Sequence, residues 1–247
     1  MISNKVSIVT ASLNCEKTIE RSLKSSLGQN YDHLEVIVVD GGSNDKTIDI
    51  ISSISDQRLK KIIENDNGIY QAWNKAIDIS SGDWICFVGG DDYWLNSNSI
   101  SRLVEKSENT NYVSAKVRIV NEKTRQSEIM GKKWDKNLIL KGMYVAHPGS
   151  LHRISLFKKR KFNSTYRIAG DHEFLIFNRH NIVASFLNDE IIYMKDAGVS
   201  RKKPFSTFLE SFHAIKSNEP YGFFLGARFF LLITIKFFIR KLLNLVK

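Results

Sequence analysis

The stretch Trp84-Ile85-Cys86-Phe87-Val88-Gly89-Gly90-Asp91-Asp92 decides the fold of this 247-residue chain. Its apolar run predicts a buried central strand, and the two glycines allow the chain to turn sharply out of that strand. Two adjacent carboxylates at the end of a strand repel each other unless a positive group lies beside them. A divalent cation is the simplest such group, and Mg²⁺ or Mn²⁺ usually brings a substrate phosphate with it. The alternative is a solvated acidic turn before a helix that begins near Asn96.

Strands and helices alternate on the N-terminal side of this stretch. Apolar runs predict strands at Val6–Thr10, Leu34–Val39 and Lys61–Ile63. We expect Asn14 to cap a first helix, and the second helix to run from about Asp45 through Ile54. A third helix follows from the helical spacing of Ile69, Ala72, Trp73, Ala76 and Ile77. This alternation predicts an α/β fold with a central, mostly parallel sheet and helices on both faces.

The pattern changes beyond residue 96. We expect a strand at Tyr112–Val120, a short helix at Trp134–Met143, a helix at Asp171–Arg179, and strands at Ile182–Leu187 and Ile191–Met194. No proline-rich or glycine-rich linker separates the two parts. The sequence therefore predicts one domain over residues 1–200, with halves 1–95 and 96–200, followed by a tail at 201–247.

Composition limits the class of protein. Apolar content of 43% and charged content of 25% are ordinary for a globular chain. Two cysteines without a paired spacing favour a reducing compartment, and the N-terminus lacks a secretory signal pattern. The net charge is +10, and the tail from Arg201 onward holds nine Lys or Arg against two Glu. Because these cations alternate with apolar runs and no nucleic-acid motif is present, they favour an anionic membrane surface over nucleic acid.

Polar turns follow three of the predicted strands. They are Thr10-Ala11-Ser12, Asp40-Gly41-Gly42 and Gly90-Asp91-Asp92. Ligands of parallel α/β sheets bind outside the carboxyl ends of the strands. The three turns therefore predict a binding site at one edge of the sheet.

Three ordered motifs resemble glycosyltransferase family 2, the inverting nucleotide-sugar transferases of the glycosyltransferase-A (Rossmann-like) fold. The motifs begin at Asp40-Gly41-Gly42-Ser43, at Asp66-Asn67-Gly68-Ile69-Tyr70 and at Ser81-Gly82-Asp83-Trp84. The resemblance covers roughly residues 5–200 and is nearest to bacterial enzymes of O-antigen, capsule and exopolysaccharide synthesis. It implies transfer of a hexose or N-acetylhexosamine from a nucleotide sugar, with UDP favoured, to a hydroxyl of a lipid-linked saccharide. Residues 1–95 would then bind the nucleotide and residues 96–200 the acceptor.

The resemblance assigns the donor side of the site. Asp40 would accept a hydrogen bond from the uracil imide, and Thr10 would lie against the nucleobase and ribose. Asp92 would coordinate a Mn²⁺ or Mg²⁺ cofactor that bridges the diphosphate, and Asp91 would contact the ribose or the water shell of that metal. The alternative role of Asp40 is to form the turn after its strand.

A second group of donor-side residues surrounds the start of the third helix. Asp66 would contact the nucleotide, cap the helix, or do both. Many relatives carry an arginine where Trp73 stands, so Lys75 would supply the positive charge for the diphosphate instead.

The acceptor side comes from the second half. Gly170-Asp171-His172-Glu173 resembles the segment that carries the catalytic base, with Asp171 the first choice and Glu173 the fallback. An N-cap role is the alternative for Asp171. His147 resembles an acceptor-side histidine, and its alternative is a packed core side chain. We expect Asp40, Asp92 and Asp171 to surround one hollow.

The tail predicts a basic amphipathic helix. On a helical wheel Lys236, Arg240, Asn244 and Lys247 fall on one side, and the apolar residues on the other are Leu231, Ile235, Phe238, Ile239, Leu242, Leu245 and Val246. The uncharged run Phe229–Ile235 has seven residues, fewer than the ~20 that span a bilayer. We therefore expect a helix on the membrane surface and a cytoplasmic protein peripheral to the inner face of the cell membrane. Packing on the protein's own core, or a dimer contact, is the alternative.

Two other functions are compatible with a nucleotide-binding sheet. One is a non-catalytic nucleotide-sugar-binding module, which transfer or hydrolysis of a nucleotide sugar would exclude. The other is a sugar-phosphate nucleotidyltransferase, which needs a glycine-rich phosphate loop near the first strand. The segment Thr10-Ala11-Ser12-Leu13-Asn14 is not such a loop.

Overall fold

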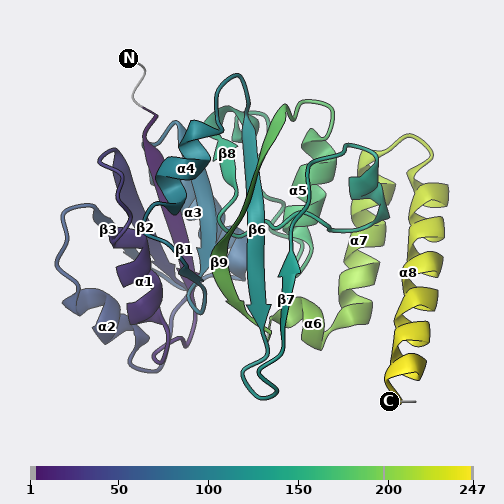
Figure 1. The fold of residues 1–247 in the computed structure, drawn as a ribbon, viewed down its shortest axis with the longest axis horizontal. Helices are drawn as coiled ribbons and strands as arrows, with labels where there is room; N and C mark the ends of the chain where they lie inside the picture. Colours follow the sequence, from purple (N-terminus) through teal and green to yellow (C-terminus); the bar gives the residue numbers. More distant parts are fainter. Residues whose placement is uncertain (1–3, 197, 246–247) are drawn as a thin grey trace.

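The computed structural model describes residues 4–196 and 198–245 and contains one continuous sheet (Figure 1). Its strands are β1 (Val6–Ser12), β2 (Leu34–Asp40), β3 (Leu59–Ile63), β4 (Trp84–Gly89), β5 (Tyr93–Trp94), β6 (Tyr112–Val120), β7 (Ser127–Met130), β8 (Leu151–Arg153) and β9 (Ala184–Lys195). The helices are α1 (Ile19–Leu27), α2 (Thr47–Ser53), α3 (Ile69–Ile79), α4 (Ser99–Glu105), α5 (Gly170–Asn178), α6 (Val199–Lys202), α7 (Pro204–Asn218) and α8 (Gly222–Leu245), with 3₁₀ turns η1 (Leu138–Lys141) and η2 (Ile154–Phe157).

The strand order is β3-β2-β1-β4-β8-β6-β9-β5, and β7 pairs with β6. The first four strands are all parallel, as their alternation with helices predicts. Beyond β4 the sheet is mixed, because β8 runs antiparallel to both β4 and β6 while β6 and β9 are parallel. Since β4 and β8 pair directly, one sheet joins residues 1–95 to residues 96–200.

Helices cover both faces of this sheet, as expected. On one face α1 and α2 bury apolar residues such as Leu23 and Ile51 against the parallel strands, and α4 buries Leu103 against β6 and β9. On the other face α3 and α5 bury a cluster of aromatic rings that includes Trp73, Phe87 and Phe174. Every side chain of β4 from Trp84 to Val88 is buried, so the run that predicts a central strand does form one.

Three local predictions are wrong in detail. Asn14 does not cap α1, because the N-cap is Thr18 and the Asn14 side chain instead accepts a hydrogen bond from the Asn44 N–H. The helix expected at Trp134–Met143 is only the 3₁₀ turn η1. The two strands expected over 182–194 form one long strand, β9, whose pairing with β6 shifts register around Lys116.

The tail forms two long helices. Figure 1 shows α7 and α8 packed side by side in antiparallel directions at one end of the sheet. The expectation that the tail is too short to span a membrane is wrong, since Gly222–Ile239 is long and apolar enough to cross one by length and composition, with mean hydropathy 1.9. Leu231, Ile235, Phe238 and Ile239 are exposed, as the helical wheel predicts. Val246, Lys247 and the side chains of Arg240, Leu242, Asn244 and Leu245 lie outside the described residues.

Candidate active site

The polar turns after β1, β2 and β4 meet at one edge of the sheet. Ser12 pairs with Asp40, and Ala11 pairs with Gly89. The Gly41 N–H donates to the Ser12 carbonyl at 3.0 Å, and the Gly90 N–H donates to the Ala11 carbonyl at 2.9 Å. The predicted convergence of these three turns is therefore present in the structure.

The Asp40 carboxylate is fully buried and organises its own turn. Its Oδ1 accepts the Gly42 and Ser43 N–H groups at 3.1 and 2.7 Å, and its Oδ2 accepts the Ser12 and Ser43 hydroxyls at 2.8 and 2.7 Å. A carboxylate offers about four acceptor sites, so these bonds engage all of them. A uracil N–H could bind Asp40 only after Ser12 or Ser43 turned away, which favours the turn-forming role.

Thr10 is also enclosed. Its side chain has no exposed surface, and within the described residues its hydroxyl has no hydrogen-bond partner. The structure therefore gives the Thr10 side chain no open face toward a nucleobase.

Asp66 lies directly over the end of β2. Its Oδ1 accepts the Gly68 N–H at 2.8 Å, and Gly68 rather than Asp66 is the N-cap of α3. A Cβ atom on Gly41 would lie 2.6 Å from Asp66 Oδ2, so the glycine is what lets the carboxylate approach. Arg167, which no sequence motif identified, places Nη1 3.1 Å from the Cβ position of Gly68. A carboxylate and an exposed cation therefore flank this turn.

Neither Lys75 nor Trp73 offers a free side chain to a ligand at this edge of the sheet. The Lys75 ammonium donates to the carbonyl of Asn65 at 3.0 Å and pairs with the Glu64 carboxylate at 3.1 Å. It therefore anchors the loop before Asp66. Trp73 is buried and stacks on His147, so it occupies the aromatic core rather than a ligand site.

Asp91 and Asp92 turn back over Gly89. A Cβ atom built on Gly89 would lie 2.9 Å from both Asp91 Oδ1 and Asp92 Oδ2, so two carboxylate oxygens converge on the space that this glycine leaves open. Asp92 is only 7% exposed and accepts one hydrogen bond, from the Gly89 N–H at 3.1 Å. Burial and the neighbouring Asp91 charge raise the pKa of Asp92 to about 8.

This pair fits a divalent cation that is shared with a ligand. Among the described residues no group of three or more His, Cys, Asp or Glu side chains could hold a metal alone. Mg²⁺ and Mn²⁺ commonly take one or two carboxylates and complete their shell with water and substrate phosphates. A positive charge beside Asp92 would favour its ionised form and so lower its raised pKa.

Asp171 lines a separate cavity of about 310 Å³ between β6, β9, α5 and α7. Its Oδ1 accepts the His172 N–H at 2.8 Å and lies 3.2 Å from the Tyr70 hydroxyl. Burial raises the pKa of Asp171. Tyr70 reaches this position because Gly170 has no Cβ, which would lie 2.8 Å from the tyrosine ring. Asp171 is in the first turn of α5 but is not its N-cap, which is Ala169.

The tail helps to build this cavity. Thr207 and Ser211 of α7 line it, and Arg201 of α6 lies at its rim. Ser211 Oγ lies 3.0 Å from His172 Nδ1, and His172 Nε2 lies 2.7 Å from the Ile139 carbonyl. Since a carbonyl only accepts, Nε2 carries the proton and the Ser211 hydroxyl donates to Nδ1.

The other acceptor-side candidates are core residues or wall residues. Glu173 is buried, pairs with Arg160 and accepts a hydrogen bond from Asn218 at 2.9 Å, and it does not line the Asp171 cavity. His147 does line the cavity, but its ring packs against both Trp73 and Phe87 in the aromatic core. Burial lowers the pKa of His147 to about 3, so it is neutral at physiological pH.

Asp40, Asp92 and Asp171 do not line one common cavity, although one hollow was predicted for them. Asp40 and Asp92 do not line the cavity that contains Asp171. Lys195 lines that cavity, and its ammonium pairs with Glu122. The bond to Glu122 is the main cause that raises the pKa of Lys195, and the charge of Asp91 adds to it. The Asp91–Asp92 turn and the Asp171 cavity are therefore neighbouring regions, with Lys195 within range of both.

Comparison with known sequences identifies relatives. The profile described as Glycosyl transferase family 2 matches residues 7–183. The Escherichia coli UDP-Glc:alpha-D-GlcNAc-diphosphoundecaprenol beta-1,3-glucosyltransferase WfaP is 41% identical over 93 residues, which are 37% of this chain and 37% of WfaP. A PGL/p-HBAD biosynthesis glycosyltransferase of Mycobacterium bovis is 26% identical over 197 residues, which are 76% of this chain and 75% of that protein.

Solved structures with the same arrangement are glycosyltransferases. The crystal structure of S. aureus TarS 1-349 in complex with UDP superposes with a TM-score of 0.66 and 22% identity, covering 91% of this chain and 70% of that TarS chain. The mannosyltransferase PcManGT from Pyrobaculum calidifontis, in complex with GDP-Man and Mn²⁺, gives a TM-score of 0.62 and 18% identity, covering 91% of this chain and 73% of PcManGT. These likenesses show that the chain has the glycosyltransferase-A fold.

Proposed function

This chain belongs to glycosyl transferase family 2, and we propose that it is a metal-dependent, inverting hexosyltransferase. It moves a hexose or N-acetylhexosamine from a UDP-sugar to a hydroxyl of a lipid-linked saccharide in cell-surface polysaccharide synthesis. The observation that carries the proposal is the convergence of Asp91 and Asp92 over Gly89 at the carboxyl edge of the parallel strands.

The donor binds at that edge. Asp92, with Asp91, would hold Mn²⁺ or Mg²⁺, and the ion supplies positive charge for the diphosphate as negative charge grows on it. Asp66, the more accessible carboxylate, would form the base and ribose side, over the turn that Asp40 organises. Arg167 lies beside the Asp66 turn, whereas Lys75 is engaged by Asn65 and Glu64, so Arg167 takes the charge-pairing role that the resemblance assigns to Lys75.

The acceptor binds in the Asp171 cavity. Asp171 removes the proton from the attacking hydroxyl, which then adds to the anomeric carbon on the side opposite the leaving diphosphate. A pKa raised by burial makes Asp171 a stronger base than an exposed aspartate. Tyr70 orients its carboxylate, and His147 and His172 act as neutral walls of the cavity.

The relatives support the choice of substrates. WfaP and TarS have UDP or a UDP-sugar in their names or complexes, and the name of WfaP includes a diphosphoundecaprenol acceptor. A Bacillus subtilis relative, the putative teichuronic acid biosynthesis glycosyltransferase TuaG, is 36% identical over 92 residues. A lipid-linked acceptor places the protein at the cytoplasmic face of the cell membrane, with α8 as its contact.

A donor panel tests the proposal. Purified protein is incubated with UDP-, dTDP- and GDP-sugars with Mn²⁺ or with chelator, and release of the nucleoside diphosphate is measured. We expect release from a UDP-sugar that stops in chelator and returns with added Mn²⁺. If no nucleotide sugar released its nucleoside diphosphate, with or without a saccharide acceptor, the result would favour a non-catalytic binding module. Full activity in chelator would remove the metal from the mechanism.

A further inference from the structure

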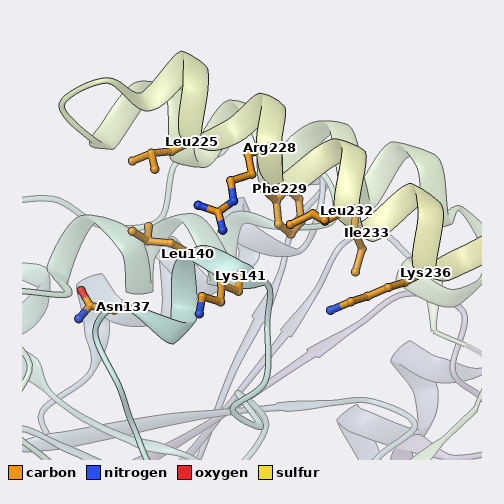
Figure 2. A pocket seen from close by; sticks show the side chains of 9 residues that line it. All are labelled: Asn137, Leu140, Lys141, Leu225, Arg228, Phe229, Leu232, Ile233 and Lys236. Carbon is orange, nitrogen blue, oxygen red and sulfur yellow. The ribbon is translucent and has the colours of Figure 1, made fainter.

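A cationic cavity of about 310 Å³ lies between α8 and η1, apart from the Asp171 cavity. Figure 2 shows Arg228 and Lys236 extending from α8 toward η1, which carries Lys141. No carboxylate lines this cavity, and across residues 4–196 and 198–245 none of these three cations forms an ion pair. The nearby carboxylate of Asp135 instead accepts the N–H groups of Asn137 and Leu138. The cavity therefore suits an anionic ligand.

The rest of the wall is apolar and opens onto exposed helix surface. Leu225, Phe229 and Leu232 of α8 line the cavity, and Leu225 and Leu232 remain 37% and 47% exposed. Leu231 beside them is 61% exposed. Lys141, Arg228 and Lys236 are exposed, so water solvates them in the unliganded protein. A free phosphate would make no use of the apolar wall, and an uncharged lipid covering the cavity would take the three cations out of water without an anion to pair with them. The combination fits a ligand in which phosphate adjoins a hydrocarbon chain.

A third cavity of about 280 Å³ lies between the cationic cavity and the Asp171 cavity. It shares the wall residues Lys141, Phe229 and Ile233 with the cationic one. It shares the wall residues Met143, Thr207 and Ser211 with the Asp171 cavity. Three adjacent cavities therefore lie in sequence from beneath α8 to Asp171.

We infer that the cationic cavity binds the diphosphate of the lipid-linked acceptor. The hydrocarbon chain of the acceptor lies along the exposed face of α8, and its saccharide extends through the third cavity to Asp171. This inference rests on the proposed function for the direction of the saccharide. It adds a lipid-diphosphate subsite formed by Lys141, Arg228 and Lys236.

The test is a calorimetric titration of the full chain with farnesyl diphosphate, a soluble polyprenyl diphosphate, in saturating UDP and Mn²⁺ so that the donor site is filled. We expect binding that weakens by about tenfold for each cation removed, and hence strongly in Lys141→Ala/Arg228→Ala/Lys236→Ala. The matched control Lys202→Ala/Lys203→Ala/Lys216→Ala removes equal charge from exposed tail lysines that line none of these three cavities. It should bind as the wild type does.

The inference would be overturned if the pocket triple variant bound farnesyl diphosphate as tightly as the wild type does, because the three cations would then not form the site. It would also be overturned if inorganic pyrophosphate or farnesol bound as tightly as farnesyl diphosphate, because the site would then not need both the phosphate and the hydrocarbon chain. Equal affinity for short-chain phosphatidylglycerol would overturn it as well, because the site would then not select a diphosphate carrier. Failure of the proposed function is separate, because it would appear as absent UDP binding in a titration without the lipid.

Discussion

Two carboxyl groups with raised pKa values have different roles in this account. Asp92 is nearly enclosed and has the charge of Asp91 beside it, so the metal-free protein holds it partly protonated near neutral pH. Asp171 opens on a cavity and is hydrogen-bonded by the backbone of His172. The first arrangement favours a cation, and the second favours a base that takes a proton from a ligand.

Asp171→Asn tests the base. The amide keeps the shape and the backbone hydrogen bond but cannot accept the hydroxyl proton, so turnover should fall by about 10²–10⁴-fold. UDP binding should stay within a factor of about two, because Asp171 lies in the acceptor cavity. Glu173→Gln is a comparison that removes only the buried ion pair with Arg160, and its loss should appear in stability. Near wild-type turnover in Asp171→Asn would show that another group is the base.

Asp92→Asn should abolish metal-dependent activity and yet stabilise the metal-free protein. The folded pKa of about 8 is above the ordinary value of 3.8, so the folded state binds more protons than the unfolded state between these values. The free energy of unfolding therefore falls as pH rises from about 4 to 8, by about 1.4 kcal/mol per unit of pKa shift.

Thermal unfolding in chelator at pH 5 and pH 8 measures this effect. The wild type should lose more stability than Asp92→Asn over that range, and added Mn²⁺ with UDP should stabilise only the wild type. Parallel pH profiles for the two proteins would contradict the raised pKa.

Some site residues were predictable because their chemistry is local. Asp91 and Asp92 follow a buried strand and two glycines, and Asp171 lies in the first turn of α5, which begins at Gly170. The contacts of Glu173 and Lys75 were not predictable, because only the folded chain brings their partners Arg160, Asn218 and Glu64 next to them. The burial of His147 likewise depends on Trp73 and Phe87, which come from distant segments.

At the scale of elements, α7 supports the acceptor cavity. The Glu210 carboxylate accepts the N–H groups of Arg167, Ile168 and Ala169, which lead into α5 and Asp171. Glu210→Ala would leave these donors without their partner, so we expect a loss of about 1–3 kcal/mol in stability and a lower turnover. The exposed Glu105→Ala is the control. Turnover and melting temperature unchanged in Glu210→Ala would mean that α7 does not position Asp171.

The exposed face of α8 should bind membranes. Leu231, Ile235 and Phe238 are 61%, 45% and 49% exposed, so changing all three to Gln removes apolar surface without disturbing the core. We expect co-sedimentation with anionic vesicles to drop severalfold while the melting temperature stays the same. Equal partitioning of this variant and the wild type would refute α8 as the membrane contact. A matched variant at the exposed Ile129 and Val183 should partition normally.

Periodicity predicted the elements well where one face of an element is buried. The helix α3 begins and carries its apolar stripe where Ile69, Ala72 and Trp73 predict it. The tail was harder, because Arg228 and Lys236 interrupt the apolar run and suggested a short surface helix. They face η1 instead, which leaves the rest of a long helix apolar. The sequence alone gives no partner for them.

At the scale of the whole molecule, one sheet joins two kinds of site. Its parallel half collects the three polar turns that we propose bind the donor, and its mixed half, with α5 and α7, encloses the cavity that we propose for the acceptor. The parallel half follows from the regular strand–helix alternation. The order of β8, β6 and β9 was not predictable, because these strands pair across long sequence separations.

Titration of UDP with and without Mn²⁺, read as a shift in melting temperature, tests the carboxylate pair most directly. At about 100 times the dissociation constant, binding stabilises a protein by about 2.7 kcal/mol, which raises the melting temperature of a chain of this size by about 5–10 °C. We predict that shift for the wild type with UDP and Mn²⁺, and a much smaller one in chelator or in Asp92→Asn. An equal shift in all three, or no shift in any, would contradict a metal-bridged nucleotide at Asp91 and Asp92.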